Sequence, residues 1–298
     1  MILCCGEALI DMLPVPDGFA PHAGGSVYNT AIALGRLGAK AGFFWGLSAD
    51  FFGDQLRAGL KAAGVDTGAC VTAPRPCTLA FVRLVEGQAS YAFYDENTAG
   101  RMLTTADLPD VNAQALFFGG ISLVAEPCGS AMEALCLREA ANCVVMVDPN
   151  IRPGFITDAP AVRARLARML VVADIVKLSG EDLDWLAPDR AGFIAGLLAG
   201  GTRLVCVTEG AGGVRAHTAQ GSVFEPARPV TVADTVGAGD TFNAGLLAAL
   251  QAAGVLTKAG LAALDVATLH TALRRGVQAA AVTVARAGAN PPWAHELD

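Results

Sequence analysis

The stretch VADTVGAGDTFNAGLLAAL, residues 232–250, places a carboxylate directly after a turn of small residues. Residues 229–233 are rich in residues that favour extended structure, and the apolar residues of 242–250 recur at helical spacing. The pattern therefore predicts a strand, a glycine turn and the start of a helix, in that order. This order is typical of α/β proteins, in which ligands bind where strands end and helices begin.

The turn has the chemistry of an anion site. Gly237, Ala238 and Gly239 let backbone N–H groups approach a ligand, and the first turn of a helix favours phosphate. Asp240 has two interpretations: it caps the helix, or it accepts the proton of a hydroxyl that attacks a phosphoryl group. The chain contains neither GxxxxGK[ST] nor GxGxxG, which excludes a Walker A loop and the dinucleotide fingerprint of dehydrogenases.

Composition limits the class of protein. The chain has 298 residues, of which 53% are hydrophobic and 16% charged, so it has enough apolar residues for a large core and is not disordered. The net charge is -7, so the chain lacks the basic excess of a nucleic-acid binder, and we expect a small-molecule ligand. Glu7 and Asp11 interrupt the apolar N-terminus, and the first basic residue is Arg36. We therefore expect no secretory signal, no membrane segment and a cytoplasmic location.

The eight cysteines form no CxxC pair and lie mostly in apolar stretches. We expect them to be reduced and buried rather than disulfide-bonded or metal-bound.

Short apolar runs alternate with helical stretches along the chain. Strands are expected in MILCCGEALIDMLP (1–14), AGFFWGLS (41–48), ALFFGGIS (115–122), CVVMVDPN (143–150), DIVKLS (174–179) and RLVCVTEG (203–210). Helices are expected at 26–38, 50–65, 129–141 and 159–172. This alternation predicts a mostly parallel sheet with helices on both faces.

The segment TLAFVRLVEGQASYAFYDEN, residues 78–97, breaks the alternation. Its two strand-like runs are separated only by the turn EGQ, which predicts an antiparallel hairpin. We expect this region, about 77–100, to form a small sheet with residues 11–20, inserted in a single domain of residues 1–298. The sheet is either a plain edge hairpin or a lid that shields a substrate from water.

With these motifs the chain resembles the ribokinase-like, or pfkB-like, carbohydrate kinases, whose C-terminal signature is DTxGAGD followed by a helix. The resemblance implies a three-layer α/β/α fold with a β-sheet lid, and ATP, Mg²⁺ and K⁺ as cofactors. It also implies that Asp240 is the catalytic base and that Gly237, Ala238, Gly239 and Asp240 form the anion hole. Asp234 would lie beside the monovalent-cation site.

The resemblance extends to the sugar site. GGSVYN, with Gly24, Gly25 and Asn29, is similar to the family's sugar-binding loop, and Asp11 matches the acidic residue that grips sugar hydroxyls. A carboxylate suits vicinal hydroxyls because it accepts two hydrogen bonds. Phe93 and Asn97, at the end of the lid hairpin, are expected sugar contacts by position.

Further motifs imply the nucleotide side. DPNIRPG resembles the D-x-N-x-R element of the family, and in it Arg152 would pair with the moving phosphate. The expected nucleotide-binding residues are Lys177, Ser179, Thr208, Gly210, Gly213, Gly237 and Gly239. Where the family carries N-x-x-E to organise Mg²⁺ through water, this chain has Ser179 and Asp182, with Glu181 as a rival for Asp182. The segment AAAVTVARAGANPPW (279–293) resembles the one that lines the adenine pocket.

Within the family, GEALID, YDENTAGRML and KLSGEDLDWL are most similar to bacterial fructokinases. This similarity implies phosphorylation of D-fructose to fructose 6-phosphate by ATP. A 2-keto-3-deoxygluconate kinase, a ribokinase or a nucleoside kinase remains an alternative, as does a non-catalytic sugar-binding or nucleotide-binding regulator. A homodimer that pairs through the lid is expected from the same resemblance.

Overall fold

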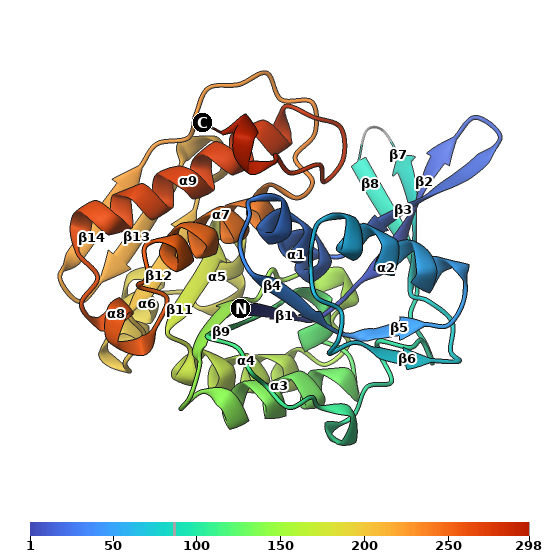
Figure 1. Cartoon of the computed structure of the whole chain (residues 1–298), viewed down its shortest axis with the longest axis horizontal. Coiled ribbons are helices and arrows are strands. Elements are labelled where there is room, and N and C mark those ends of the chain that lie inside the picture. Colours follow the sequence, from blue (N-terminus) through green and yellow to red (C-terminus); the bar gives the residue numbers. More distant parts are fainter. Residues whose placement is uncertain (86–87, 298) are drawn as a thin grey trace.

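The computed structural model describes residues 1–85 and 88–297, and it has the expected three-layer architecture (Figure 1). An eight-stranded sheet forms the middle layer. Its strands, in spatial order, are β14 (Gly221–Glu225), β13 (Val214–Thr218), β12 (Leu204–Thr208), β11 (Ile175–Ser179), β10 (Val144–Asp148), β9 (Ala115–Gly119), β1 (Ile2–Cys5) and β4 (Ala41–Phe44). The strands from β4 to β12 are parallel, and β13 and β14 extend the sheet antiparallel.

Helices cover both faces of this sheet (Figure 1). On one face lie α1 (Ser26–Arg36), α2 (Phe51–Ala62), α7 (Ala238–Ala252), α8 (Lys258–Ala262) and α9 (Val266–Val284). On the other face lie α3 (Cys128–Glu139), α4 (Ala159–Val172) and α6 (Arg190–Ala199), and α5 (Gly180–Leu186) follows β11 directly. Because both faces are covered, strands such as β9 and β10 are buried along their whole length and have continuous apolar sequences.

The predicted lid is a separate four-stranded sheet. Its order is β3 (Gly18–Gly24), β2 (Leu9–Val15), β7 (Leu79–Val85) and β8 (Gln88–Tyr94). The strands β7 and β8 pair antiparallel as expected, whereas residues 86 and 87 of the predicted turn lie outside the described residues. Asp11 is paired with Ala80, and Ala80 with Phe93, so these side chains share one face of the lid sheet.

Three sequence predictions about strands are wrong. MILCCGEALIDMLP is not one strand, because the chain turns at Gly6 (φ 154°) and passes from β1 in the main sheet to β2 in the lid. AGFFWGLS also divides: β5 (Gly46–Ser48) leaves the main sheet and pairs with β6 (Val71–Ala73). Residues 229–233 form no strand, because the sheet ends at β14 and the amide of Ala233 donates instead to the carbonyl of Val284, at 2.8 Å.

The predicted helices agree with the structure within a few residues, and short helical turns complete the chain. These turns are η1 (Thr105–Asp107), η2 (Gly120–Leu123), η3 (Pro153–Phe155), η4 (Gly210–Gly212) and η5 (Ala294–Glu296). Helices α7 and α9 pack so closely that a Cβ on Gly245 would lie 2.7 Å from Cα of Gly276. Close contact between these two helices fixes the position of the N-terminal turn of α7.

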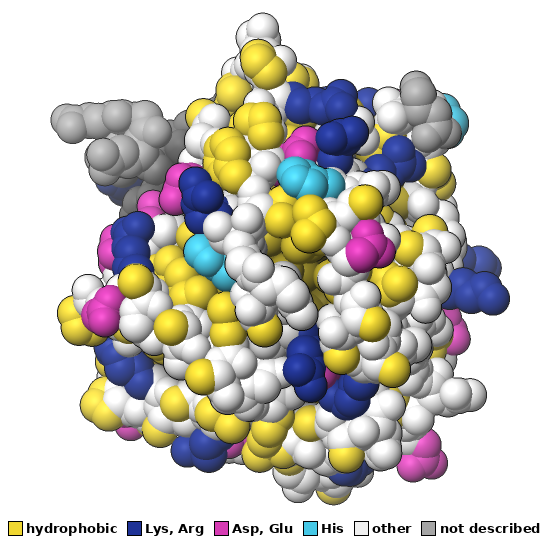
Figure 2. Space-filling view, turned by 90° about the vertical axis from the view of Figure 1, so that its left-hand side faces the viewer, with side chains coloured by type: hydrophobic (Ala, Val, Ile, Leu, Met, Phe, Trp, Pro, Cys, Tyr) yellow, Lys and Arg dark blue, Asp and Glu magenta, His cyan; other side chains and the backbone are white. Residues whose placement is uncertain are grey.

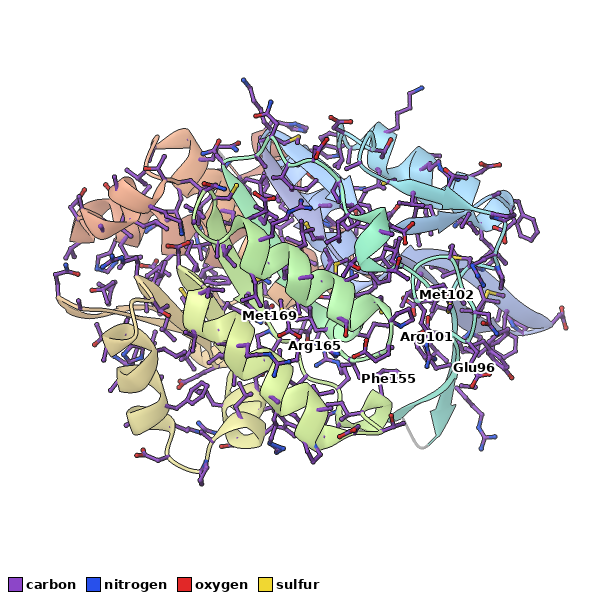
Figure 3. All side chains as sticks on the ribbon, turned by 90° about the horizontal axis from the view of Figure 1, so that it is seen from below. Glu96, Arg101, Met102, Phe155, Arg165 and Met169 are labelled. Atoms are coloured by element: carbon purple, nitrogen blue, oxygen red, sulfur yellow. The ribbon has the colours of Figure 1, made fainter. Side chains whose placement is uncertain are left out.

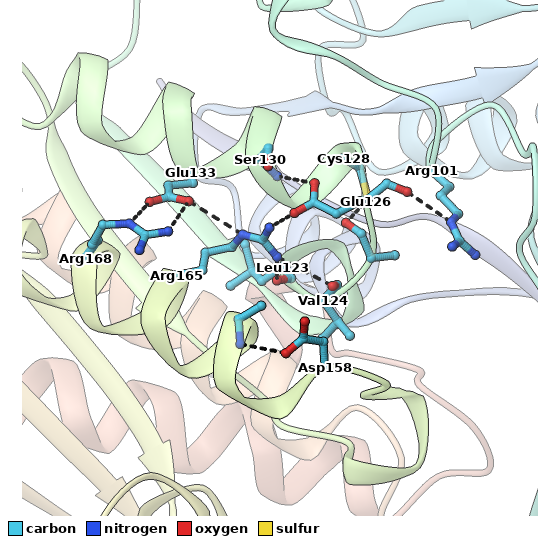
Figure 4. Close-up of polar contacts among 12 residues, drawn as sticks. Arg101, Leu123, Val124, Glu126, Cys128, Ser130, Glu133, Asp158, Arg165 and Arg168 are labelled. Carbon is cyan, nitrogen blue, oxygen red and sulfur yellow. Dashed lines mark hydrogen bonds and ion pairs between the residues drawn. The ribbon is translucent and has the colours of Figure 1, made fainter.

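Arg165, a buried residue of α4, fixes the segment that follows β9 (Figure 4). Its guanidinium donates to the carbonyl of Leu123, at 2.8 Å, and forms ion pairs with Glu126 and Glu133. Figure 3 shows Arg165 on the side of the molecule covered by α3 and α4. The contact holds η2, whose first residues line the site described below.

All eight cysteines are free thiols, and seven of them are buried, as the sequence predicts. Among the described residues, no helix is long and apolar enough to cross a membrane. Seen from the β14 side, basic and acidic side chains are interspersed over the surface (Figure 2).

Candidate active site

A cavity of about 670 Å³ opens at the carboxyl ends of the parallel strands, between the main sheet and the lid. Residues that follow β1, β9, β10, β11 and β12 line one side, and the first turn of α7 lines another. A second, more apolar cavity of about 540 Å³ adjoins it and shares Thr208, Gly210 and Gly239. Ligands of open α/β sheets bind at this edge because strand ends and helix N-termini meet there.

Asp240 lies in the wall of the first cavity. It is the third residue of α7, whose N-cap is Gly237 in a left-handed conformation (φ 77°), so Asp240 is not the helix cap. A Cβ on Gly237 would come within 2.8 Å of Ala289, which makes glycine necessary at this turn. Gly237, Ala238 and Gly239 all line the cavity, and the amides of a first helical turn lack partners within the helix.

The carboxylate of Asp240 is held by two side chains of α1. The Ser26 hydroxyl donates to Oδ1 at 2.7 Å, and the Asn29 amide donates to Oδ2 at 2.9 Å. Burial raises the pKa of Asp240 to about 6, although the two donors act in the opposite direction. The resemblance implies a sugar contact for Asn29; Asn29 lines the cavity and also contacts Asp240. At neutral pH the group is ionised and has unused lone pairs to accept a proton.

Glu7 is a site residue that the sequence analysis missed. It is 3% exposed, lines the cavity and accepts hydrogen bonds from the amides of Ser26 (3.0 Å) and Ser122 (3.1 Å). Burial raises its pKa to about 7. The available signal in the sequence was an acidic residue just after an apolar strand. The residues that donate hydrogen bonds to it are distant in sequence, so its role could not be predicted.

Lys177 reaches the cavity from inside β11. Its ammonium pairs with Asp148 at 3.0 Å, and Asn243 donates to the same carboxylate oxygen at 2.7 Å. Burial lowers the pKa of Lys177, but the carboxylates of Asp148 and Asp182 outweigh burial and raise it. The Lys177 ammonium lies 3.1 Å from the position that a Cβ on Gly239 would occupy, so it adjoins the α7 turn.

The structure gives Asp182 a different position from the one expected. Asp182 is 2% exposed and is not among the described residues that line the cavity. One of its oxygens accepts the amide of Ile151 (2.7 Å), and the other accepts the amide and hydroxyl of Ser179. It therefore braces the loop after β10 against α5, whereas its rival Glu181 lines the cavity together with Ser179.

The lid supplies the remaining wall of the first cavity. Asp11, Ala80 and Phe93 line it, and the Phe93 ring lies 4.7 Å from that of Phe155 in η3. Burial raises the pKa of Asp11 to about 6, partly offset by His22. Asp11 lies within β2, the second of the two strands into which the expected strand 1–14 divides.

Gly24 and Gly25 have different positions relative to the cavity. A Cβ on Gly24 would lie 2.2 Å from Asp11 Oδ2, so Gly24 leaves room for that carboxylate, and Gly25 lines the cavity as the N-cap of α1. Asn97 is exposed in the turn after β8 and is absent from the described lining. The structure therefore does not place Asn97 in the wall of the first cavity, and its contact with sugar stays a prediction.

On the nucleotide side, Arg152 is exposed and lines the first cavity beside Asn150. Gly213 lines the second cavity, together with Val214, Phe242 and Val284. Ala280 and Ala281, from the segment expected near adenine, line it too.

Asp234 braces the glycine turn. Its carboxylate accepts the amides of Val236 (3.0 Å) and Gly288 (2.9 Å), which ties the turn to the chain after α9. Among the described residues, no group of three or more His, Cys, Asp or Glu side chains could hold a metal ion. A cation beside Asp234 would therefore need other oxygen ligands, such as backbone carbonyls or water.

Comparisons with known proteins agree with this geometry. The sequence model of a family described as pfkB family carbohydrate kinase matches residues 1–296. The chain is 55% identical over 285 residues to a fructokinase of Rhizobium leguminosarum bv. trifolii, covering 93% of this chain and 86% of that protein.

Solved structures are similar over almost the whole chain. A fructokinase of Xylella fastidiosa with bound ATP has a TM-score of 0.92 at 33% identity, covering 99% of this chain and 96% of that one. A fructokinase of Vibrio cholerae O395, in a form with bound fructose, ADP and calcium ion, has a TM-score of 0.84 at 26% identity, covering 97% and 94%.

Proposed function

The chain belongs to the pfkB family of carbohydrate kinases, and from that premise we propose that it phosphorylates D-fructose to fructose 6-phosphate with Asp240 as general base. It is an ATP-dependent sugar kinase, a phosphotransferase with an alcohol group as acceptor. The observation that carries the catalytic proposal is the position of Asp240, an ionisable group in the cavity wall on the same helical turn as Gly237 and Gly239.

The proposed reaction uses both parts of this turn. The 6-hydroxyl oxygen of the sugar forms a bond with the γ-phosphorus, and its proton passes to Asp240. The bond between the γ-phosphorus and the bridging oxygen breaks, and its electron pair leaves with ADP. The amides of 237–239 stabilise the negative charge on the moving phosphoryl group, and Lys177 and Arg152 supply positive charge at the cavity wall. Asp240 then releases the proton to solvent.

The lining of the sugar side supports a neutral sugar rather than a sugar acid. On the lid it is formed by Asp11, Ala80 and Phe93, that is, by a carboxylate, a small residue and an aromatic ring, whereas the cations Lys177 and Arg152 line the cavity outside the lid. Carboxylates accept hydrogen bonds from hydroxyls and repel a sugar carboxylate. This argues against 2-keto-3-deoxygluconate, and the relative named fructokinase at 55% identity favours fructose over ribose or a nucleoside.

The second cavity supports the position of the nucleotide. Its lining is mainly apolar, with Val214, Phe242, Ala281 and Val284, and suits the flat face of adenine. Thr208, Gly210 and Gly239 lie where the two cavities meet, so the phosphates would pass there toward Asp240. Gly213 takes a left-handed φ of 108°, and a Cβ there would approach the carbonyl of Glu225 at 2.4 Å.

We propose Mg²⁺ and K⁺ as the ions of this site. Oxygen donors suit Mg²⁺, and Glu181, Ser179 and Asn150 offer them in the cavity wall, where they would hold the hydrated ion that screens the ATP phosphates. Asp182 is engaged in bracing the chain, so we assign the Mg²⁺ role to Glu181 in its place. For K⁺ we propose the surroundings of Asp234, whose carboxylate orders the turn through Val236 and Gly288.

We also propose a homodimer that forms through the lid sheet. The face that carries Asp11, Ala80 and Phe93 lines the cavity, and successive residues of a strand alternate between faces. The opposite face carries Phe81 with Phe19 and Tyr94 around it, at ring distances of 5.0 and 5.6 Å. Phe19 and Tyr94 are 47% and 61% exposed, which is an apolar surface suited to a second copy.

The test is ADP release measured with D-fructose, D-ribose, 2-keto-3-deoxygluconate and adenosine. We expect the highest kcat/KM with fructose, and Asp240→Asn should lower kcat by about 10² to 10⁴ while sugar affinity changes little. Asp110→Asn, which changes an exposed aspartate outside both cavities, is the matched control. Preference for another sugar would overturn only the fructose assignment. ATP binding without turnover on any sugar would indicate a regulator.

A further inference from the structure

Helix α1 carries a hydroxyl that contacts the catalytic carboxylate and that the proposed reaction does not yet use. Ser26 is the first residue of α1, and its hydroxyl lies 2.7 Å from Asp240 Oδ1. Asn29 is one turn later on the same face and donates to Oδ2 at 2.9 Å. The two donors come from different side chains and reach different oxygens, so together they fix the plane of the carboxylate.

Ser26 is itself fixed by Glu7. Glu7 Oε1 accepts the Ser26 amide at 3.0 Å, Glu7 Oε2 accepts the Ser122 amide at 3.1 Å, and the Glu7 carbonyl accepts the Tyr28 amide at 3.1 Å. The start of α1 and the η2 segment are therefore both attached to one buried carboxylate.

Two glycines let the backbone close around Glu7. A Cβ on Gly25 (φ 106°) would lie 2.7 Å from the Glu7 carbonyl oxygen, and a Cβ on Gly120 (φ 65°) would lie 2.0 Å from Glu7 Oε1. The close contacts of Gly25 and Gly120 with Glu7 thus hold the backbone that carries the Ser26 hydroxyl in one position.

The charged groups around Asp240 do not make the hydrogen bond from Ser26 unnecessary for keeping Asp240 ionised. Glu7 and Asp148 are carboxylates that oppose its ionisation, Asp11 lies across the same cavity, and Lys177 is the nearby cation that favours ionisation. The ammonium of Lys177 is already paired with Asp148. Direct hydrogen bonds from Ser26 and Asn29 are therefore the local contacts that favour the carboxylate form.

We propose that Ser26, held by Glu7, is a positioning residue that keeps the carboxylate of Asp240 ionised and oriented toward the attacking hydroxyl. The inference rests on the proposed role of Asp240 as general base. The burial that raises the pKa of Asp240 to about 6 is opposed by this donor, and its removal therefore moves the pKa farther up. The loss of activity in a Ser26 variant is greatest at low pH, where Asp240 is more often protonated.

The experiment is the pH profile of kcat for the full-length chain with saturating sugar and ATP. We expect Ser26→Ala to move the acidic limb upward by about one pKa unit, because a hydrogen bond to a charged group is lost. Activity then falls about tenfold below pH 6 and recovers toward the wild-type value above pH 8. Ser26→Thr keeps a hydroxyl and should restore the limb.

Two further variants separate this role from a structural one. Ser48→Ala removes a hydroxyl that is also buried but donates to Asp50, outside both cavities, so its limb should stay at the wild-type position. Glu7→Gln turns one acceptor into a donor that opposes the Ser26 or Ser122 amide, so its limb should move in the same direction as in Ser26→Ala. The thermal midpoint of each variant identifies those that fail to fold.

An unchanged limb in a folded Ser26→Ala, or an equal loss of kcat at all pH values, would overturn the inference while Asp240→Asn remained inactive. If Asp240→Asn kept full activity, the proposed function itself would fail instead.

Discussion

Asp11 is the lid residue that we propose binds the sugar. Its carboxylate faces the cavity between Leu9 and Ala80, and the absence of a side chain on Gly24 leaves room for it. Burial raises its pKa to about 6, so it is ionised at neutral pH and protonated in mild acid. In the ionised form both oxygens can accept hydrogen bonds from sugar hydroxyls, because neither oxygen carries a proton.

We predict that Asp11→Asn raises the Kd for sugar by roughly 10- to 100-fold, because charge-assisted hydrogen bonds contribute about 1.5–3 kcal/mol. The Kd for ATP should not change. In the wild type the Kd for sugar should rise as the pH falls through about 6, since protonation removes acceptors, and this rise should be smaller in Asp11→Asn. Calorimetric titration at pH 5.5 and 8 measures both effects.

The matched control is Asp17→Asn, which removes the same charge at an exposed position of the same hairpin. Equal sugar affinities for Asp11→Asn and the wild type would refute the contact.

At the residue scale, the sequence was informative wherever a short motif carries the chemistry. Asp240 and the glycines before it lie in the cavity wall as the motif predicts. Ser26 was not predicted, because its partner is 214 residues away and such a contact depends on how α1 packs against α7. Asp182 has the residue type of a metal-side group, but its carboxylate already accepts hydrogen bonds from the amide and hydroxyl of Ser179.

Among the elements, α7 depends most on the conformation of one turn. Gly237 has φ 77° and faces Ala289, whereas Gly254, at the other end of the same helix, has φ 72° with no atom within 4 Å of an added Cβ. Both positions require a left-handed backbone, but only Gly237 also has a close neighbour and lies in the cavity wall. Comparing substitutions at the two positions therefore separates the cost of backbone strain from the effect on function.

We predict that Gly237→Ala and Gly254→Ala each lose about 1–2 kcal/mol of stability, because a left-handed conformation is costly for alanine. Gly237→Ala should lose more, since its Cβ would contact Ala289 at 2.8 Å. It should also lower kcat at least about tenfold, because it would move the amides that we propose face the phosphoryl group. Thermal unfolding and steady-state kinetics of the two variants provide the comparison, and equal kcat values would contradict it.

Helix positions were predictable because apolar spacing and end signals are local. Strand boundaries were less so: the turn at Gly6, where a Cβ would lie 2.6 Å from Val27, divides one apolar run between two sheets. Residues 229–233 have strand-like composition, but no strand lies beside them to complete a hydrogen-bonded ladder. Pairing is a tertiary property, so composition alone predicted the wrong structure there.

For the whole molecule, the parallel sheet and the lid were predicted together, and the association of two chains remains a prediction. The outer face of the lid exposes Phe19 and Tyr94, and its edges are the strands β3 and β8. Burial of these rings between two copies would remove apolar surface from water.

We predict a mass near twice the 30.4 kDa of one chain in sedimentation experiments. The double substitution Phe19→Ser with Tyr94→Ser should shift the chain to the single-chain mass. Val171→Ser, at an exposed apolar residue of α4 outside the lid sheet, should not. A wild-type protein that stays at the single-chain mass at all concentrations would refute the lid dimer.

The burial of the cysteines has a practical consequence for chemical labelling. Seven thiols are buried, the eighth, Cys70, is half-buried, and burial raises the pKa of all eight, that of Cys70 to about 12. Maleimides react with the thiolate, so the native cysteines should react slowly. A cysteine introduced at Asp17, on the exposed tip of the β2–β3 hairpin, would react first. A fluorophore or spin label can therefore be attached to the lid without replacing any native cysteine.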